Sequence, residues 1–278
     1  MTEAATSFPS APSPTLATAS LGPAIEAREI GKSYHSMRGA DVIALDRVSF
    51  HVDAGEFVAV VGPSGCGKST LLRIVAGLVP LTSGEIVRAG HRVEGPDREI
   101  GFVFQSPVLL PWRTVLQNVI LPLEFRGGTG VAEQERALAL LASVGLDGFA
   151  DRYPHELSGG MQQRAAIARA LVTDPSILLM DEPFGALDAM TREHMNLEVL
   201  RLWTERRKTV LFITHSIAES VFLSDRVLVM TPRPGRLAET ISIDLPRPRT
   251  LSILNTERAG AYVSRIRALL QAQGALTE

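Results

Sequence analysis

The sequence has little lysine, few aromatic residues and almost no cysteine. Its 278 residues include three lysines, 5% aromatic residues and a single cysteine, Cys66. One cysteine excludes an intrachain disulfide and fits a reducing compartment. The 28 basic and 30 acidic residues give a net charge of -2. This balance excludes an overall positive field that would attract nucleic acid or an acidic membrane.

Long apolar runs and a basic amino terminus are also missing. The longest apolar segments, such as Phe57–Val61, are the size of a strand and far shorter than the roughly 18 residues of a transmembrane helix. We therefore expect a chain that does not span a membrane. The first 24 residues are rich in Ala, Ser, Thr and Pro, and no Lys or Arg precedes Arg28. A signal peptide would need that basic start and an apolar stretch, so we predict a disordered tail over residues 1–24.

The rest of the chain alternates strand-like and helical patterns, which favours one α/β domain with a largely parallel sheet. The strand segments consist almost entirely of Val, Ile, Leu and Phe, as expected for strands that are buried on both faces. We predict strands at Phe57–Val61, Ile100–Phe104, Ile177–Met180, Val210–Ile213 and Val227–Met230.

A helical insertion interrupts this alternation. Residues 115–125, 132–144 and 160–172 have helical spacing, and the run Arg126–Gly130 breaks it. We predict an inserted α-helical subdomain at about 106–172 within one larger domain at 25–245. The remaining residues, 246–278, follow a proline-rich extended segment, Leu245–Arg249, and are expected to end in a helix over Thr256–Gln273.

A phosphate-binding loop follows the first predicted strand. It is Gly62-Pro63-Ser64-Gly65-Cys66-Gly67-Lys68-Ser69, and a predicted helix begins at Thr70. This G-x-x-x-x-G-K-S pattern places backbone N–H groups around phosphate oxygens at a helix amino terminus. The lysine reaches the terminal phosphates and the serine hydroxyl can coordinate Mg²⁺. With three lysines in the whole chain, an accidental match is improbable, and an ordinary strand-turn-helix is the weaker interpretation.

Two adjacent carboxylates, Asp181 and Glu182, end the predicted strand Ile177–Met180. Burial of acidic side chains needs a functional partner. Beside a phosphate loop, the first carboxylate can help to hold Mg²⁺ and the second can position or deprotonate the attacking water. Two solvated acids at an exposed strand end are the alternative.

A serine and two glycines precede the helix at 160–172. Ser158 can cap this helix, and Gly159 and Gly160 leave its first N–H groups bare, which makes a second anion-binding helix end. Helix capping alone is the simpler explanation for an isolated Ser-Gly-Gly. Here, however, the run Leu157–Arg164 resembles the signature sequence of ATP-binding cassette (ABC) proteins, and the other marks of that family follow in family order.

The resemblance extends from about Glu26 to Thr231 and implies a P-loop NTPase core of RecA type, an antiparallel β subdomain and an inserted helical subdomain. It implies ATP and Mg²⁺ as cofactors. By resemblance, Tyr34 stacks on adenine, Gln105 senses Mg²⁺ and the γ-phosphate, Asp188 crosses to a partner subunit, and His215 holds the γ-phosphate. Without the motifs around them, each would be assigned a structural role. Gln162 is expected at the nucleotide with the signature, whereas Met161 stands where many members have Gln.

The resemblance also implies a dimer, because each ATP is bound between the phosphate loop of one subunit and the signature of the other. With no membrane span of its own, the chain would be the ATPase of an ABC importer, peripheral at the cytoplasmic face of the cell membrane. Its partners would be a second, identical ATPase subunit, a separate permease and, indirectly, an extracellular solute-binding protein. The segments 104–118, 181–190, 233–236 and 245–249 resemble the nitrate, sulfonate and taurine importer group.

Two other functions remain as alternatives. A soluble ATP-driven nucleic-acid factor is disfavoured by the near-neutral charge, so no nucleic-acid partner is expected. A small-molecule kinase explains the phosphate loop but leaves the signature and His215 without a role.

Three further expectations concern particular segments. We predict that Val108–Asn118 docks a cytoplasmic helix of the permease, since it carries much apolar surface for a loop; a local core is the alternative. We expect Cys66 to be a reactive thiol, because a helix amino terminus and Lys68 both lower a thiol pKa; an inert, inward-facing thiol is the alternative. For Arg247 and Arg249, a solvated tail and a regulatory role are equally open.

Overall fold

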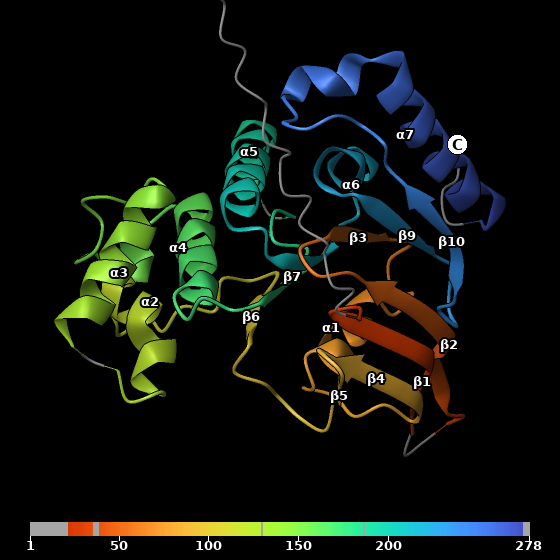
Figure 1. Ribbon diagram of the computed structural model, residues 1–278, viewed down its shortest axis with the longest axis horizontal. Coiled ribbons are helices and arrows are strands. Elements are labelled where there is room, and N and C mark those ends of the chain that lie inside the picture. Colours follow the sequence, from red (N-terminus) through yellow and green to blue (C-terminus); the bar gives the residue numbers. More distant parts are fainter. Residues whose placement is uncertain (1–21, 36–38, 129, 186, 275–278) are drawn as a thin grey trace, which may run out of the picture.

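The protein is described by a computed structural model over residues 22–35, 39–128, 130–185 and 187–274. Most of the predicted disordered tail, residues 1–21, lies outside these ranges, as do residues 275–278 at the end of the chain. Two β-sheets lie side by side, and a group of helices projects from one of them (Figure 1).

The larger sheet has six strands in the order β10-β9-β3-β8-β7-β6. The first five of them along the chain are parallel, and β10 is antiparallel to β9. The five strands predicted from the sequence are confirmed, with ends that differ by at most one residue. The strands are β3 (Phe57–Val61), β6 (Ile100–Val103), β7 (Ile177–Asp181), β8 (Thr209–Ile213), β9 (Arg226–Met230) and β10 (Leu237–Ser242).

The smaller sheet is antiparallel, as the expected β subdomain requires, with the order β2-β1-β4-β5. Its strands are β1 (Ile25–Tyr34), β2 (Val42–Val52), β4 (Ser83–Arg88) and β5 (His91–Arg92). Helix α1 (Lys68–Val75) packs between the two sheets, where its buried residues Leu71 and Leu72 join one apolar cluster with Ile30 and Val60. This cluster fixes the start of α1 beside both sheets.

The opposite face of the parallel sheet is covered by helices α4 (Gly159–Leu171), α5 (Ala189–Arg206), α6 (Ile217–Leu223) and α7 (Glu257–Ala272). Helices α2 (Val115–Glu124) and α3 (Val131–Ser143) pack with α4 into the projecting group in Figure 1, which is the predicted helical insertion. Short 3₁₀ turns occupy Pro154–Glu156 and Leu251–Asn255. Across the described ranges, every helix is too short or too polar to cross a bilayer.

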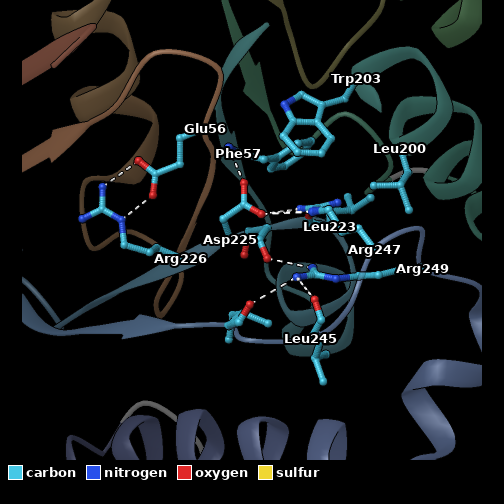
Figure 2. A network of polar contacts seen from close by, with 12 residues as sticks. Glu56, Phe57, Leu200, Trp203, Leu223, Asp225, Arg226, Leu245, Arg247 and Arg249 are labelled. Atoms are coloured by element: carbon cyan, nitrogen blue, oxygen red, sulfur yellow. Dashed lines mark hydrogen bonds and ion pairs between the residues drawn. The ribbon is translucent and has the colours of Figure 1, made fainter. Parts of the chain in front are cut away.

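Two arginines fasten the segment after β10 to the end of α6 (Figure 2). Arg249 is 4% exposed and donates to five backbone carbonyls, those of Val221, Phe222, Ser224, Ile243 and Leu245. Arg247 binds Asp225 at 2.8 Å, and its guanidinium lies 4.1 Å from the ring centre of Trp203. Three of these carbonyls belong to the carboxyl-terminal end of α6, where a cation is favourable. The solvated-tail interpretation of both arginines is therefore wrong.

Candidate functional site

The phosphate loop joins β3 to α1 in the geometry that its sequence predicts. Gly67 precedes the first helical residue with a φ of 104°, a conformation that side chains with a Cβ rarely adopt. Lys68 is 6% exposed, and its Nζ donates to the carbonyls of Gly62 at 2.8 Å and Pro63 at 3.0 Å. The lysine ammonium thus lies across the loop that contains Ser64 and Gly65, where phosphate oxygens would accept its hydrogen bonds.

The expectation of a reactive Cys66 is wrong. Its side chain is 1% exposed and packs in the apolar cluster around α1 rather than toward solvent. Burial raises the pKa of the thiol, and this outweighs the charge of Lys68, which lowers it. The sequence correctly places the cysteine near a cation and a helix start, but the direction of its side chain decides the sign of the shift.

We expect Cys66 to resist alkylation in the folded protein, because a buried, protonated thiol is neither accessible nor nucleophilic. Labelling with N-ethylmaleimide at pH 7 should be slow and should not depend on added nucleotide. In urea, the same thiol should be labelled rapidly, which controls for reagent quality. Rapid labelling of the native protein would mean that the loop opens readily.

The two carboxylates at the end of β7 face the phosphate loop differently. Asp181 is 4% exposed, and its Oδ1 accepts a hydrogen bond of 2.8 Å from Ser69 Oγ. Burial raises the pKa of Asp181, while the hydrogen bond from Ser69 opposes that rise. Hydroxyl and carboxylate oxygens are ligands that Mg²⁺ prefers, so this pair fits the predicted metal ligands.

Glu182 is the point at which three separate segments meet. Gln105 Nε2 donates to Glu182 Oε2 at 3.3 Å, and His215 Nδ1 lies 3.5 Å from the same oxygen. The φ of Glu182 is 44°, an uncommon value for a residue other than glycine, and its N–H donates to the Ile213 carbonyl. Such backbone conformations persist where surrounding structure enforces them and are frequent at active sites. The parallel order of β6, β7 and β8 brings these three side chains together.

A cleft of about 270 Å³ extends from Glu182 and the phosphate loop to the antiparallel sheet. Tyr34, the residue predicted to contact adenine, is 43% exposed at its rim, and Lys32 Nζ lies 4.9 Å from its ring centre. Three lining residues, Val42, Ala44 and Arg233, were not candidates from the sequence, and Arg233 is the charged one among them. The lining residues are Tyr34, Val42, Ala44, Ser64, Gly65, Gly67, Lys68, Ser69, Thr70, Glu182 and Arg233.

The signature residues do not line this cleft. Ser158 caps α4 by accepting a hydrogen bond of 3.3 Å from Met161 N, and Gly159 stands exposed at the helix start. A side chain at Gly160 would come within 2.8 Å of Thr191 on α5, so only glycine allows the two helix ends to pack this closely. Gln162 turns back and donates to the Pro154 and Leu157 carbonyls.

Helix α4 is also bonded to the segment after β6. The buried amide of Gln163 donates to the Phe104 carbonyl at 3.2 Å, directly before Gln105. Arg169 donates to the carbonyls of Pro107 and Val108. Asp188 is exposed and caps α5 through Thr191 N at 3.0 Å, and this bond lowers the pKa of its carboxyl. The signature at the start of α4 and Asp188 at the start of α5 therefore pack together, away from the phosphate loop of the same chain.

Comparisons with known proteins agree with this geometry. The family model described as ABC transporter matches residues 45–185. The taurine import ATP-binding protein TauB of Rhizobium johnstonii is 54% identical over 209 residues, which are 75% of this chain and 80% of the relative. The aliphatic sulfonates import ATP-binding protein SsuB of Bacillus cereus is 43% identical over 226 residues, 81% of this chain and 88% of the relative.

A solved structure shares the fold. It is a dimeric post-hydrolysis state of the ATP-binding cassette MJ0796 bound to ADP and Pi, and it superposes with a TM-score of 0.72 at 36% identity. The match covers 80% of this chain and all of that structure. The phosphate loop, the acidic strand end, the signature helix and these similarities lead to one conclusion: the chain belongs to the ATP-binding proteins of the ABC transporter family.

Proposed function

We propose that the protein is the ATP-hydrolysing subunit of an ABC importer and drives uptake of a small anion, a sulfonate, taurine or nitrate, through a separate permease. The observation that carries the proposal is the meeting of Gln105 and His215 at the carboxylate of Glu182, beside the loop that holds Lys68. The names of its relatives, taurine and aliphatic sulfonates import proteins, support the class of solute.

Each side chain has a separate task in this proposal. Lys68 and the loop N–H groups bind the terminal phosphates, and Tyr34 supports the adenine. Glu182 orients the attacking water and accepts its proton, while Gln105 and His215 fix the carboxylate and contact the γ-phosphate. Ser69 and Asp181, with Gln105, would hold Mg²⁺, which neutralises the negative charge that develops on the phosphates.

The metal site depends on the nucleotide. Within the described ranges, the His, Cys, Asp and Glu side chains form no group of three or more that could hold a metal ion. Mg²⁺ is usually bound through one or two carboxylates and substrate phosphates, so Ser69 and Asp181 need the nucleotide to complete the coordination. Binding of Mg²⁺ should therefore be tight only in the presence of ATP or ADP.

A second copy of the chain would complete the site. Ser158 and Gly159 leave the start of α4 open to solvent, away from the cleft of the same chain, and a helix start of this kind attracts phosphate. In a dimer like that of the relative, the signature of one copy would face the cleft of the other. ATP turnover that rises with the square of protein concentration at low concentration would test this arrangement.

The direct test of the function combines turnover with its partner. Purified protein should hydrolyse ATP with Mg²⁺ and lose that activity in excess EDTA. Coexpression with its permease should place the protein on the cytoplasmic side of membranes, and turnover there should rise when the loaded solute-binding protein is added to the other side. If turnover does not change with the permease, the protein is an ATPase and the proposed role in transport is contradicted.

The segment Val108–Asn118 is proposed as the surface that binds the permease. Trp112 is 71% exposed and Val108 57% exposed, whereas Leu109 packs against the core. Asn118 is fully buried and exchanges hydrogen bonds with Leu110 while donating to the carbonyls of Arg113 and Thr114. The loop that presents Trp112 is therefore held in one conformation before any partner arrives, which lowers the entropy lost on binding.

We expect Trp112→Ala to weaken permease binding about tenfold or more, because a central exposed tryptophan commonly dominates an interface. The measurement is copurification of the two proteins, with cysteines at 108 and 112 crosslinked to the permease. Phe125→Ala is a control of similar exposure, since this residue is 78% exposed on the far end of α2. Crosslinks confined to this chain would contradict the proposal.

A further inference from the structure

We propose that Arg233 is a nucleotide-contacting residue whose guanidinium binds the phosphate groups nearest the nucleoside. This inference rests on the proposed ATP site and adds to it a residue to which the sequence motifs assign no role at the nucleotide. Arg233 lies in the turn between β9 and β10 and lines the same cleft as Tyr34, Ser64 and Gly65.

The turn that carries Arg233 is bonded to β2 and within itself. Gly235 N donates to the Ala44 carbonyl at 3.0 Å, and Asp46 N donates to the Gly235 carbonyl at 3.0 Å, which joins the turn to β2. Arg236 pairs with Asp46, and Thr231 Oγ1 accepts from Arg236 N at 3.0 Å. Because Gly235 and Arg236 bond to β2 and Thr231 closes the turn onto Arg236, Arg233 is presented to the cleft from a rigid support.

The guanidinium itself lies against the phosphate loop. Its Nε and Nη2 donate to the Gly65 carbonyl at 3.2 and 3.1 Å. Within the described part of the chain, no carboxylate lies within 4.0 Å of it, and no hydrogen bond uses Nη1. The arginine is exposed, so solvent access to the free edge remains. A cation that lines a phosphate-binding cleft without an acidic partner has an anion as its natural ligand.

The strand order indicates which phosphates it would reach. Arg233 follows β9, which neighbours β3 on one side, whereas Asp181 and Glu182 follow β7, two strands away on the other side. The reacting γ-phosphate belongs near Glu182, and Tyr34 marks the nucleoside. Arg233 therefore faces the part of the phosphate chain that ADP and ATP share. Its contact is the same before and during hydrolysis, so it contributes to binding and not to the rate of the chemical step.

The test measures binding and turnover separately. Arg233→Gln should weaken ADP binding about tenfold by isothermal titration calorimetry, a change of about 1.4 kcal/mol. The KM for ATP should rise by a similar factor while kcat stays within twofold of wild type. Arg233→Lys keeps the charge but loses the planar fork, so its affinity for ADP should lie between those of wild type and Arg233→Gln. The defect of Arg233→Gln should shrink as NaCl rises from 50 to 500 mM, because salt screens an exposed charge.

Arg265→Gln is the matched control, because it removes one exposed positive charge that pairs with Glu239 on β10 and lies outside the cleft, and ADP should bind it as it binds wild type. Thermal melting of each variant verifies folding. ADP affinity of Arg233→Gln within twofold of wild type overturns the inference. An equal loss in Arg265→Gln also overturns it, since the effect would then come from removing any surface charge. If wild-type protein does not bind ADP at all, the proposed function fails instead.

Discussion

Glu182→Gln should reduce ATP turnover by about 10² to 10⁴ while leaving ATP binding intact. The amide preserves the shape of the side chain, and Gln105 and His215 can still lie against its oxygen. What disappears is the negative charge that orients water and takes its proton. Turnover of [γ-³²P]ATP and equilibrium binding of ATP, measured on the same preparation, separate the two effects.

With hydrolysis blocked, ATP should hold two copies together, so gel filtration with Mg-ATP should show a dimer that dissociates when nucleotide is removed. Glu205→Gln is a suitable control, because this exposed residue on α5 pairs with Arg201 and lies outside the site. Its turnover should match wild type. Wild-type turnover in Glu182→Gln, measured with the permease present, would remove Glu182 from the mechanism.

Arg249→Met should lower the free energy of unfolding by about 3 kcal/mol, since a buried acceptor left without a donor costs about 1–3 kcal/mol. Five carbonyls lose their donor together. The substitution also removes a buried positive charge, and the cost of burying that charge offsets part of the loss. Burial of the guanidinium, reinforced by the nearby charge of Arg247, lowers the pKa of Arg249 to about 10, so the charged form is partly penalised in the fold. Urea denaturation followed by circular dichroism measures the difference.

Arg258→Met is the matched control for this substitution. Arg258 pairs with Asp244 at the surface, where its side chain is 57% exposed, and exposed pairs of this kind contribute at most about 1 kcal/mol. The free energy of unfolding of Arg249→Lys should lie between those of wild type and Arg249→Met, because one ammonium offers fewer donors than the guanidinium fork. An unchanged midpoint in Arg249→Met would indicate that water satisfies these carbonyls equally well.

The parallel sheet and the phosphate loop could be predicted from the sequence because their signals are local. A run such as Phe57–Val61 is apolar at every position, and a strand buried on both faces requires that composition. The order of strands then brings Asp181 and Glu182 to the loop, since carboxyl ends of parallel strands share one edge. Helix α5 was not predicted, because its exposed face carries charged residues and its apolar periodicity is weak.

The rest could not be predicted because it depends on backbone groups brought together by the fold. The five acceptors of Arg249 come from two stretches, residues 221–224 and 243–245, and a carbonyl leaves no mark in the sequence. Arg233 binds another backbone carbonyl, that of Gly65, 168 residues earlier. For Cys66, local sequence supplies the charges that lower its pKa, while burial, which raises it, is a property of the whole core.

The hydrogen bonds from α4 to the segment after β6 link the candidate permease-binding surface to the signature. Arg169 lies in the last turn of α4 and donates to the Pro107 and Val108 carbonyls, and the signature lies at the amino-terminal end of the same helix. Asn118 and Arg169 hold the loop that carries Trp112 through hydrogen bonds, so a displacement of Trp112 would be transmitted to α4. In an importer, a movement of the permease against this loop would then reach Ser158, and ATP turnover would rise above its basal rate when a loaded transporter makes that movement. Stimulation of ATP turnover by the loaded transporter would thus depend on the rigidity of one helix.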